Sequence, residues 1–306
     1  MTTSFEQELQ PGSVIIGKWN KSQYRVERLL GAGANGKVYL VKRGQLSYAM
    51  KIGFDAADHQ SEINALKVLS RSDTSFRNYL LDVDDFRLGG VDYPYYIMRY
   101  IKGQSMTDFI WRNGRDWVHL IGLNMLRKLV ELHAQSYIFG DIKVQNMLVS
   151  GYGDVELIDF GGVTAKGRSV KQFTEVYDRG YWGAGSRTAD EAYDLFAFAV
   201  LIISSMESEQ RLKGLDKLLP QNRSVELLLG MLQSNTALRP VAPLLRKALL
   251  GQYATSRQAL AEWRRQGYKK PALASSKKGL AGWLKLCFAL SLLMFGVTLY
   301  LVYWPS

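Results

Sequence analysis

Polar residues at fixed spacings give this chain the side chains to handle a phosphate chain and a divalent cation. Lys51 ends the run Ala49-Met-Lys, and Glu62 follows eleven residues later. The motif Asp141-Ile-Lys-Val-Gln-Asn146 combines a carboxylate, a lysine and an amide, and Asp159-Phe-Gly161 begins thirteen residues after it. A lysine for phosphates, a base, and an amide and a carboxylate for Mg²⁺ are what phosphoryl transfer needs, because that reaction depends on positioning and charge neutralisation.

A glycine-rich turn precedes these residues. Gly31-Ala-Gly-Ala-Asn-Gly36 has the GxGxxG spacing that several nucleotide-binding folds share. The strand-like residues 37–41 follow, whereas a dinucleotide-binding fold or a P-loop requires a helix at that place. Val38 also stands where a P-loop needs a hydroxyl, and it completes the pattern GxGxxGxV. Since glycine has no side chain, such a turn can fold closely over phosphates.

In this order and spacing, the motifs resemble those of the eukaryotic-like (Hanks-type) serine/threonine protein kinases, over about residues 24–250. The chain is further similar to the membrane-anchored bacterial kinases of Bacillus-type spore formers. That similarity rests on Gly17-Lys-Trp-Asn20, Gly31–Gly36, Ile101-Lys-Gly103, Ile138-Phe-Gly-Asp141 and Tyr177-Asp-Arg-Gly-Tyr-Trp-Gly183. The resemblance implies a two-lobed fold that transfers the ATP γ-phosphate to Ser or Thr of protein substrates, with autophosphorylation.

The resemblance also implies a role for each site residue. Asp141 would orient and deprotonate the substrate hydroxyl, while Lys143 would steady the γ-phosphate. Lys51 would hold the α- and β-phosphates and pair with Glu62. The implied ligands of Mg²⁺, with Mn²⁺ as an alternative, are Asn146 and Asp159. The implied ATP-binding residues are Gly31, Gly33, Gly36, Val38, Ala49, Lys51, Met98, Tyr100 and Leu148.

The catalytic segment departs from the family pattern at two positions. Phe139 and Gly140 replace the usual His-Arg before the catalytic aspartate. Phe139 can continue an apolar spine through Leu66 and Phe160, so this change is compatible with activity. Gly140 removes the arginine that usually reads a phosphorylated activation segment, which argues against control through that arginine.

The activation segment lacks the Ala-Pro-Glu that normally closes it. Arg239 therefore has no family-type carboxylate partner, and Glu191 is a candidate for that place. The candidate autophosphorylation sites are Thr164, Ser169, Thr174, Ser186 and Thr188.

Apolar patterning divides the chain into a strand-rich and a helix-rich part. Runs rich in Val, Ile, Leu and Tyr predict strands at 24–30, 37–41, 48–52, 80–88 and 93–100. Apolar residues at helical spacing predict helices at 61–70, 117–135, 191–206, 225–233 and 241–250. The expected fold class is α+β, with a five-stranded antiparallel N-lobe that carries one helix and a mainly helical, reduced C-lobe.

The expected divisions are a lead-in (1–23), the N-lobe (24–102), the C-lobe (103–250), a basic juxtamembrane linker (251–285) and a transmembrane helix (286–304). A single cysteine excludes an internal disulfide and a cysteine zinc site. Three histidines, none spaced at i, i+4, argue against a metal–histidine cluster. Residues 1–12 have no apolar core, so no cleaved signal peptide is expected.

The last apolar run predicts a membrane anchor. Residues 286–304 are nineteen residues without a charge, close to the roughly 20 that a helix needs to span a bilayer. Residues 240–285 carry ten basic side chains against Glu262 alone. Because basic flanks stay on the cytoplasmic side, we expect a single-pass, tail-anchored protein of the cell membrane with its kinase domain in the cytoplasm. A buried core helix is the alternative reading of this run.

The net charge of +11 and the basic segment 246–285 predict an anionic partner. Acidic lipid head groups and nonspecific DNA are the two candidates, and Tyr253, Trp263 and Tyr268 could stack on exposed bases. Clustering on either partner would favour self-association and trans-autophosphorylation, since tethering raises the effective concentration.

Two other functions compete with a protein kinase. Gly140-Asp141 followed by Asn146 echoes the catalytic loop of aminoglycoside- and choline-type small-molecule kinases, whereas Lys143 and Asp159-Phe-Gly161 disfavour them. The departures at positions 139 and 140 also fit a catalytically silent pseudokinase scaffold.

Overall fold

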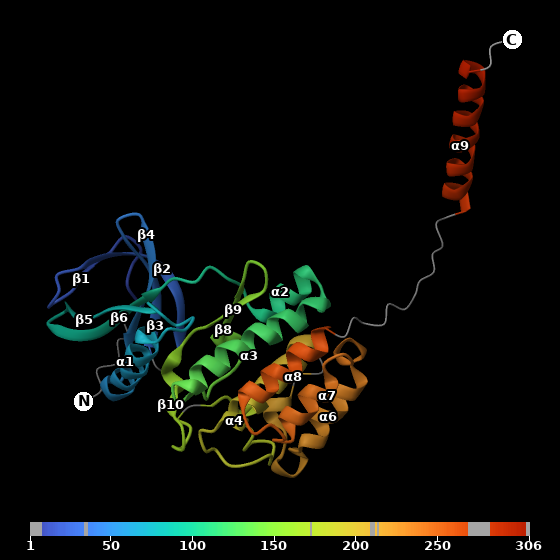
Figure 1. Cartoon of the computed structure of the whole chain (residues 1–306). Coiled ribbons are helices and arrows are strands. Elements are labelled where there is room, and N and C mark those ends of the chain that lie inside the picture. The colour runs from blue at the N-terminus through green and yellow to red at the C-terminus, as the bar shows by residue number, and fades with distance from the viewer. Residues whose placement is uncertain are drawn as a thin grey trace. The chain divides into compact units, whose positions relative to one another are not determined.

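A computed structural model describes residues 8–33, 36–171, 173–208, 212, 214–268 and 282–303. The chain divides into two compact units, residues 1–266 and 267–306. The first unit contains a strand-rich N-lobe, blue to cyan in Figure 1, and a helix-rich C-lobe that runs from green to orange.

The N-lobe is an antiparallel sheet of six strands in the order β1-β2-β3-β4-β6-β5. Its strands are β1 (Val14–Ile16), β2 (Gln23–Gly33), β3 (Gly36–Arg43), β4 (Leu46–Gly53), β5 (Leu80–Leu88) and β6 (Val91–Arg99). The five predicted strands all form, but the prediction of a five-stranded sheet is wrong because β1 adds a sixth. This strand lies in the part of the chain that was expected to be a lead-in.

Strand β1 belongs to the lobe because its central side chain and the turn that follows it are both anchored. Ile15 is buried and lies opposite Tyr24 of β2. In the turn, the Asp84 carboxylate accepts hydrogen bonds from the backbone N–H groups of Trp19 and Asn20. A Cβ at Gly17 would lie only 2.3 Å from Asp84 Oδ2, so the turn needs glycine there. The lead-in therefore fastens one edge of the sheet to β5.

Helix α1 (Ala56–Arg71) is the single helix that the structure describes in the N-lobe. Asp55 caps its start by accepting hydrogen bonds from two backbone N–H groups of the first turn, which otherwise have no partner. Ile63 and Leu66 on its apolar face are buried, and Glu62 lies beside them. The spacing of these residues thus turns Glu62 inward with the core.

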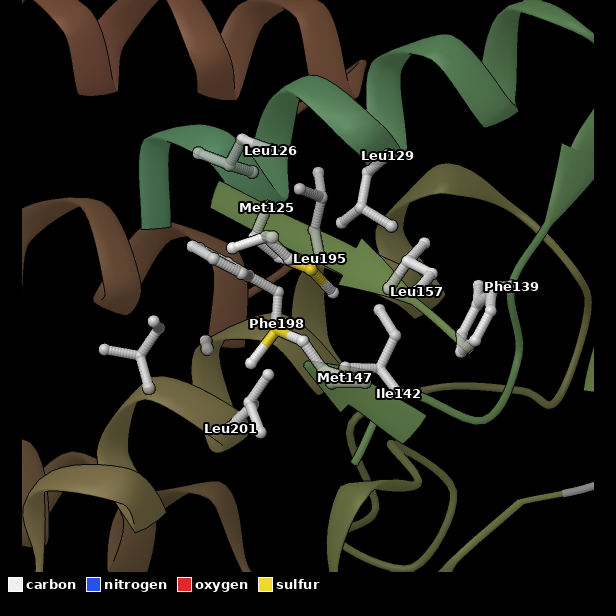
Figure 2. Packing of buried hydrophobic residues seen from close by; sticks show 14 of the residues in the cluster. Met125, Leu126, Leu129, Phe139, Ile142, Met147, Leu157, Leu195, Phe198 and Leu201 are labelled. Carbon is white, nitrogen blue, oxygen red and sulfur yellow. The ribbon is translucent and has the colours of Figure 1, made fainter. Parts of the chain in front are cut away.

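The C-lobe is built on helices that pack around α4. Its helices are α2 (Met106–Asn113), α3 (Val118–Ala134), α4 (Glu191–Met206), α6 (Val225–Ser234), α7 (Ala242–Leu249) and α8 (Ser256–Tyr268). Almost every side chain of α4 is buried, as its nearly continuous apolar sequence requires. Figure 2 shows residues of α3, such as Met125 and Leu129, packed with Leu195 and Phe198 of α4.

Short strands hold the loops of the site on this helical base. Strands β8 (Met147–Ser150) and β9 (Asp154–Leu157) form a hairpin, and β7 (Tyr137–Ile138) pairs with β10 (Thr164–Ala165). The segment that contains Asp141 lies between β7 and β8, and Asp159 lies two residues after the end of β9. Both polar segments are therefore fixed at their ends by strand pairing.

The sequence patterns predict that the linker starts at residue 251, and this boundary is wrong. The first residues of the expected linker, through Gln266, belong to the first unit. Tyr253, Leu260 and Trp263 are buried, and α8 packs on the C-lobe. A Cβ at Gly122 of α3 would lie 2.4 Å from the Trp263 ring, so the ring fills the space that the glycine leaves. The folded body therefore extends to Gln266. Residues 269–281 of the predicted linker lie outside the described residues.

In the second unit, residues 282–303 form helix α9 (Gly282–Tyr303). Within the part of the chain that the structure describes, no helix meets the length and hydropathy needed to cross a membrane. The predicted span 286–304 ends at Trp304, which lies outside the described residues, so the span stays a prediction.

Candidate functional site

Lys51 of β4 lies between two carboxylates from other parts of the chain. Its Nζ donates hydrogen bonds to both carboxylate oxygens of Glu62, at 2.9 and 2.8 Å, and to Asp159 Oδ1 at 2.7 Å. Only 3% of the Lys51 side chain is exposed, against 41% of the Asp159 side chain. The structure thus brings together three of the predicted residues, with one carboxylate left open to a ligand.

Charge compensation keeps Lys51 and Asp159 ionised. Burial disfavours the ammonium of Lys51, but Glu62 and Asp159 outweigh it and hold the pKa of Lys51 above its ordinary value. Burial likewise works against the carboxylate of Asp159, but Lys51 outweighs it and holds the pKa of Asp159 below its ordinary range. The lysine is therefore cationic and Asp159 anionic at neutral pH, as binding of phosphates and a metal requires.

Tyr96 of β6 is a site residue that the sequence analysis missed. Its hydroxyl donates a hydrogen bond of 2.8 Å to Glu62 Oε1, and the side chain is fully buried. This contact fixes the carboxylate that orients Lys51. The alternation of β6 places Tyr96 on the face toward α1, but the sequence does not show which residue of α1 it meets.

Asp141 is the centre of a second polar cluster. Its Oδ2 accepts hydrogen bonds from Lys143 Nζ at 2.6 Å and from Asn146 Nδ2 at 3.0 Å. Its Oδ1 accepts a hydrogen bond of 2.9 Å from the hydroxyl of Thr174. Asn146 also donates to the backbone carbonyl of Asp141 at 2.9 Å, which fixes the bend of the loop. The predicted Asp, Lys and Asn therefore lie together, with Thr174 as an unexpected fourth member.

The two clusters are connected by an apolar spine. The Phe139 ring lies 5.7 Å from the Phe160 ring, edge to face, and both rings are fully buried with Leu66. Tyr79 contacts the same Phe160 ring, with 5.0 Å between the ring centroids. Because Phe160 is held here, the preceding Asp159 adopts a left-handed backbone with φ of +60° and its carboxylate faces Lys51. The predicted continuation of the spine by Phe139 is confirmed.

The backbone at Gly140 explains why no arginine stands there. Gly140 has a φ of +80°, and a Cβ on it would lie 2.7 Å from the carbonyl oxygen of Gly162. A residue with a side chain would be strained and would collide with the activation segment. The departure from the family pattern is therefore a property of the loop conformation.

Two acid–base pairs order the end of the activation segment. Arg187 pairs with the fully buried Asp178 at 2.7 Å, and Arg179 pairs with Asp190 at 2.7 Å.

Glu191 does not take the place expected for a partner of Arg239. Its carboxylate accepts a hydrogen bond of 2.6 Å from Lys166 and others from Ser256.

The three glycines of the glycine-rich turn have different surroundings, so glycine is present at each position for a different reason. Gly36 has a φ of +148°, and a Cβ there would lie 2.2 Å from the carbonyl oxygen of Ile52. At Gly31 and Gly33 a Cβ would meet nothing within 4 Å, so the fold does not explain the missing side chains. Two glycines beside open space fit the close approach of a phosphate chain.

The remaining ATP-binding candidates come from adjacent strands. Val38 lies opposite Lys51 across β3 and β4, and Ala49 lies opposite Met98 across β4 and β6. Leu148 lies in β8 of the other lobe, and Tyr100 follows the end of β6. Because neighbours in register share a face, Val38 and Lys51 place an apolar and a cationic group on the same side of the sheet.

The donors for a metal ion are one carboxylate and one amide. Asn146 is buried and uses its Nδ2 to bond Asp141, which leaves its amide oxygen for a cation. Within the described residues no group of three or more His, Cys, Asp or Glu side chains could hold a metal. Asp159 and Asn146 fit Mg²⁺, since that ion is usually held by one or two protein ligands with phosphate oxygens and water.

Comparisons with known proteins agree with this geometry. A model of the protein kinase domain matches residues 24–243. The chain is 36% identical over 258 residues to the serine/threonine-protein kinase YabT of Bacillus subtilis, covering 83% of this chain and 74% of YabT. It is 30% identical over 161 residues to PrkC of the same organism, covering 50% of this chain and 24% of PrkC.

A solved structure with low sequence identity has the same fold. The kinase PK-1 of the Cydia pomonella granulovirus superposes with a TM-score of 0.59 at 17% identity, over 78% of this chain and 92% of that chain. The predicted α+β kinase fold is thereby confirmed. The family match argues against the small-molecule kinase, and the assembled polar clusters argue against the silent scaffold. The chain belongs to the protein kinase family and is a serine/threonine protein kinase similar to YabT.

Proposed function

We propose that this kinase binds Mg·ATP between the glycine turn and the Lys51 cluster and transfers the γ-phosphate to Ser and Thr hydroxyls of proteins. The observation that carries this proposal is the buried Lys51, which is bonded at once to Glu62 and Asp159. Lys51 would neutralise the α- and β-phosphates, while Asp159 and Asn146 would hold Mg²⁺ or Mn²⁺. The metal would supply charge neutralisation on the phosphates.

In this proposal Asp141 would receive the substrate hydroxyl. Its carboxylate is held by Asn146, Lys143 and Thr174, so it is fixed before a substrate arrives. In the proposed reaction the substrate hydroxyl donates its proton to Asp141, and its oxygen forms the new bond to the γ-phosphorus as the bond to ADP breaks. The ammonium of Lys143 would then face the charge on the transferred group.

Autophosphorylation of the full chain with Mg·ATP tests this proposal. Lys51→Met and Asp141→Asn should each abolish the label while the circular dichroism spectrum is unchanged. Asp154→Asn is a matched control, because Asp154 is an exposed carboxylate at the start of β9. Label that persists in Asp141→Asn would contradict the role of Asp141.

We further propose that the apolar run 286–304, most of which lies in helix α9, anchors the kinase in the cell membrane, with the kinase domain in the cytoplasm. Its described side chains between residues 286 and 300 are all exposed, including Phe288 (69%), Leu293 (66%) and Phe295 (63%). A continuous exposed apolar surface favours a membrane or a protein partner. Leu293→Arg should release the protein from the membrane fraction, since a charge at the centre of a span costs about 3 kcal/mol. Leu219→Arg, at an exposed site in the first unit, is the control.

The exposed arginines of α8 support the proposal that this helix contacts the phosphate groups of an anionic partner. Arg257, Arg264 and Arg265 are exposed and share one helix face at i, i+7 and i+8. The predicted stacking of Tyr253 and Trp263 on bases is wrong, because both side chains are buried in the first unit. A membrane surface is therefore the favoured partner, and nonspecific DNA would be held by backbone contacts alone.

Vesicles and DNA distinguish these partners. Autophosphorylation should rise when vesicles of anionic lipid are added. The triple variant Arg257→Ala/Arg264→Ala/Arg265→Ala should lose this stimulation. The double variant Arg25→Ala/Arg28→Ala, on β2, is the control and should be stimulated like the wild type. A rise with duplex DNA, steeply reduced by salt, would assign the stimulus to DNA. A rate per molecule that increases with surface density would support trans-autophosphorylation by clustered copies. An equal rate with and without either surface would contradict the proposed activation.

A further inference from the structure

Glu191, the first residue of α4, connects three segments of the C-lobe. Its Oε1 accepts a hydrogen bond of 2.6 Å from Lys166, which directly follows β10. Its Oε2 accepts hydrogen bonds from the backbone N and the hydroxyl of Ser256, at 2.6 and 2.9 Å, at the start of α8. The same oxygen lies 3.6 Å from Nδ1 of His133 in α3. One carboxylate therefore contacts the activation segment, α8 and α3.

From His133 the path continues into the catalytic loop. Nε2 of His133 lies 2.9 Å from Asp194 Oδ2. Asp194, which is fully buried, accepts hydrogen bonds from the backbone N–H groups of Phe139 at 2.7 Å and Gly140 at 2.9 Å. These two residues immediately precede Asp141. No step between Ser256 and the catalytic loop exceeds 3.6 Å.

Helix α8 is docked at a second point, away from Ser256. The Trp263 ring is buried against Gly122 of α3 and Phe198 of α4, and its Nε1 donates a hydrogen bond of 2.9 Å to the carbonyl of His119. The sequence continues from α8 into the basic residues 269–285 and then into the apolar run. Those residues are joined to α8 through the backbone, so a ligand or surface that binds them acts on the chain directly after α8.

We propose that Glu191 is a positioning residue, which couples the docking of α8 to the geometry of the catalytic loop through His133 and Asp194. While α8 is docked, Ser256 fixes the Glu191 carboxylate beside the His133 ring, and the ring fixes Asp194 under the loop amides. When α8 leaves, Glu191 loses both hydrogen bonds from Ser256, and the loop that carries Asp141 loses this support.

The charges around His133 make the coupling measurable. Burial disfavours a charged ring, but Asp194 and Glu191 outweigh it and hold the pKa of His133 above its ordinary value. The nearby His133 ring in turn contributes most to holding the pKa of Glu191 well below its usual range. Both acids that face the ring come from α4, and Lys166 lies beyond Glu191. Removal of the Glu191 charge should therefore lower the pKa of His133.

Histidine titration by NMR on the full chain tests the first half of the coupling. The chain has three histidines, so the signals can be assigned by single substitutions. Glu191→Gln should lower the pKa of His133 and leave His59 and His119 unchanged. Glu226→Gln, which alters an exposed acid in the first turn of α6, should change none of the three. A His133 titration that is identical in Glu191→Gln would overturn the proposal.

Kinetics test the second half. Gly122→Ala should push Trp263 and α8 away without touching Glu191, because the new methyl carbon would lie 2.4 Å from the ring. Both Glu191→Gln and Gly122→Ala should lower kcat roughly tenfold, as for one lost charged hydrogen bond, with KM for ATP unchanged. In Glu191→Gln the alkaline limb of the kcat profile should also move to lower pH, which a mere loss of stability would not cause.

Wild-type kcat and an unmoved profile in Glu191→Gln, in a protein whose melting temperature is normal, would overturn the coupling. The proposal rests on the kinase reaction, but the two can fail separately. An inactive wild-type chain would refute the reaction, whereas the histidine titration reports on the coupling without any turnover.

Discussion

The hydroxyl of Thr174 donates a hydrogen bond of 2.9 Å to Asp141 Oδ1. The activation segment thereby contacts the carboxylate on which the reaction depends. Lys143 Nζ lies 3.4 Å from the same hydroxyl and 2.6 Å from the other oxygen of Asp141. The three side chains form a closed ring, so an ordered activation segment and a correctly oriented Asp141 require each other.

Thr174→Ala should lower kcat because it opens this ring. The loss of one hydrogen bond to a charged group corresponds to about 1.5–3 kcal/mol, or roughly 10- to 100-fold in rate. Thr174→Ser keeps the hydroxyl and should retain most of the activity. Steady-state kinetics on both variants measures the difference. Equal activity of the Ala and Ser variants would show that the hydrogen bond does not matter, and it would leave Thr174 a candidate for phosphorylation only.

Substitutions in the glycine turn should separate ligand binding from folding. Gly33→Ala should raise KM for ATP roughly tenfold while the melting temperature stays near the wild-type value, because a Cβ there meets no protein atom. Gly36→Ala should lower the melting temperature, since its Cβ would collide with the Ile52 carbonyl. Thermal melts and ATP titrations distinguish the two effects. A destabilised Gly33→Ala variant with normal KM would contradict this reading of the turn.

Gly140→Ala should destabilise the kinase by about 2 kcal/mol or more. The left-handed backbone costs a residue with a side chain about 1–2 kcal/mol, and the collision with Gly162 adds to it. Gly44→Ala is a matched control, since Gly44 has a φ of +60° and no neighbour within 4 Å of a Cβ. Urea unfolding of both variants gives the difference. Equal losses would mean that the contact with the activation segment costs nothing.

Stability should fall as the pH drops from about 6.5 toward 4, because of His59. This ring is buried against Tyr96, and neither ring nitrogen has a hydrogen-bond partner among the described residues. Burial, with help from the charge of Lys51, lowers the pKa of His59 to about 4. The unfolded chain binds the proton more readily, so His59 should cost about 3 kcal/mol of stability at pH 4 relative to pH 7.

His59→Phe removes the titrating group while it keeps an aromatic ring against Tyr96. Denaturant unfolding across this pH range should therefore show a flatter pH dependence for the variant. The same slope in both proteins would place the acid sensitivity in other groups.

The residues of the site could be predicted because each lies in a short motif whose spacing depends on local structure. Lys51 and Glu62 are separated by one strand end and the first turns of a helix, so their distance in sequence determines their distance in space. Asp141 and Asn146 lie on one loop for the same reason. The apolar runs likewise marked the five expected strands and the helices around them.

The contacts that were missed depend on tertiary packing. Tyr96 and Thr174 carry no motif, and their partners lie 34 and 33 residues away. Strand β1 is too short to show a pattern and forms because Asp84 holds the following turn. Helix α8 is rich in charged residues and looked like a linker, since its burial depends on a few side chains such as Trp263 that fit the C-lobe.

The packing of Trp263 against Gly122 and Phe198 affects how fragments of this kinase fold, both in the laboratory and in the cell. A fragment that ends at residue 250, near the limit of the family match, would contain Gly122 and Phe198 but would lack Trp263, which packs against them. The apolar surface at these two residues would face water, and such surfaces promote aggregation of newly made chains. During synthesis this apolar surface stays uncovered until residues 256–268 have been made. The C-lobe therefore completes its folding only after the ribosome has passed the end of the family match.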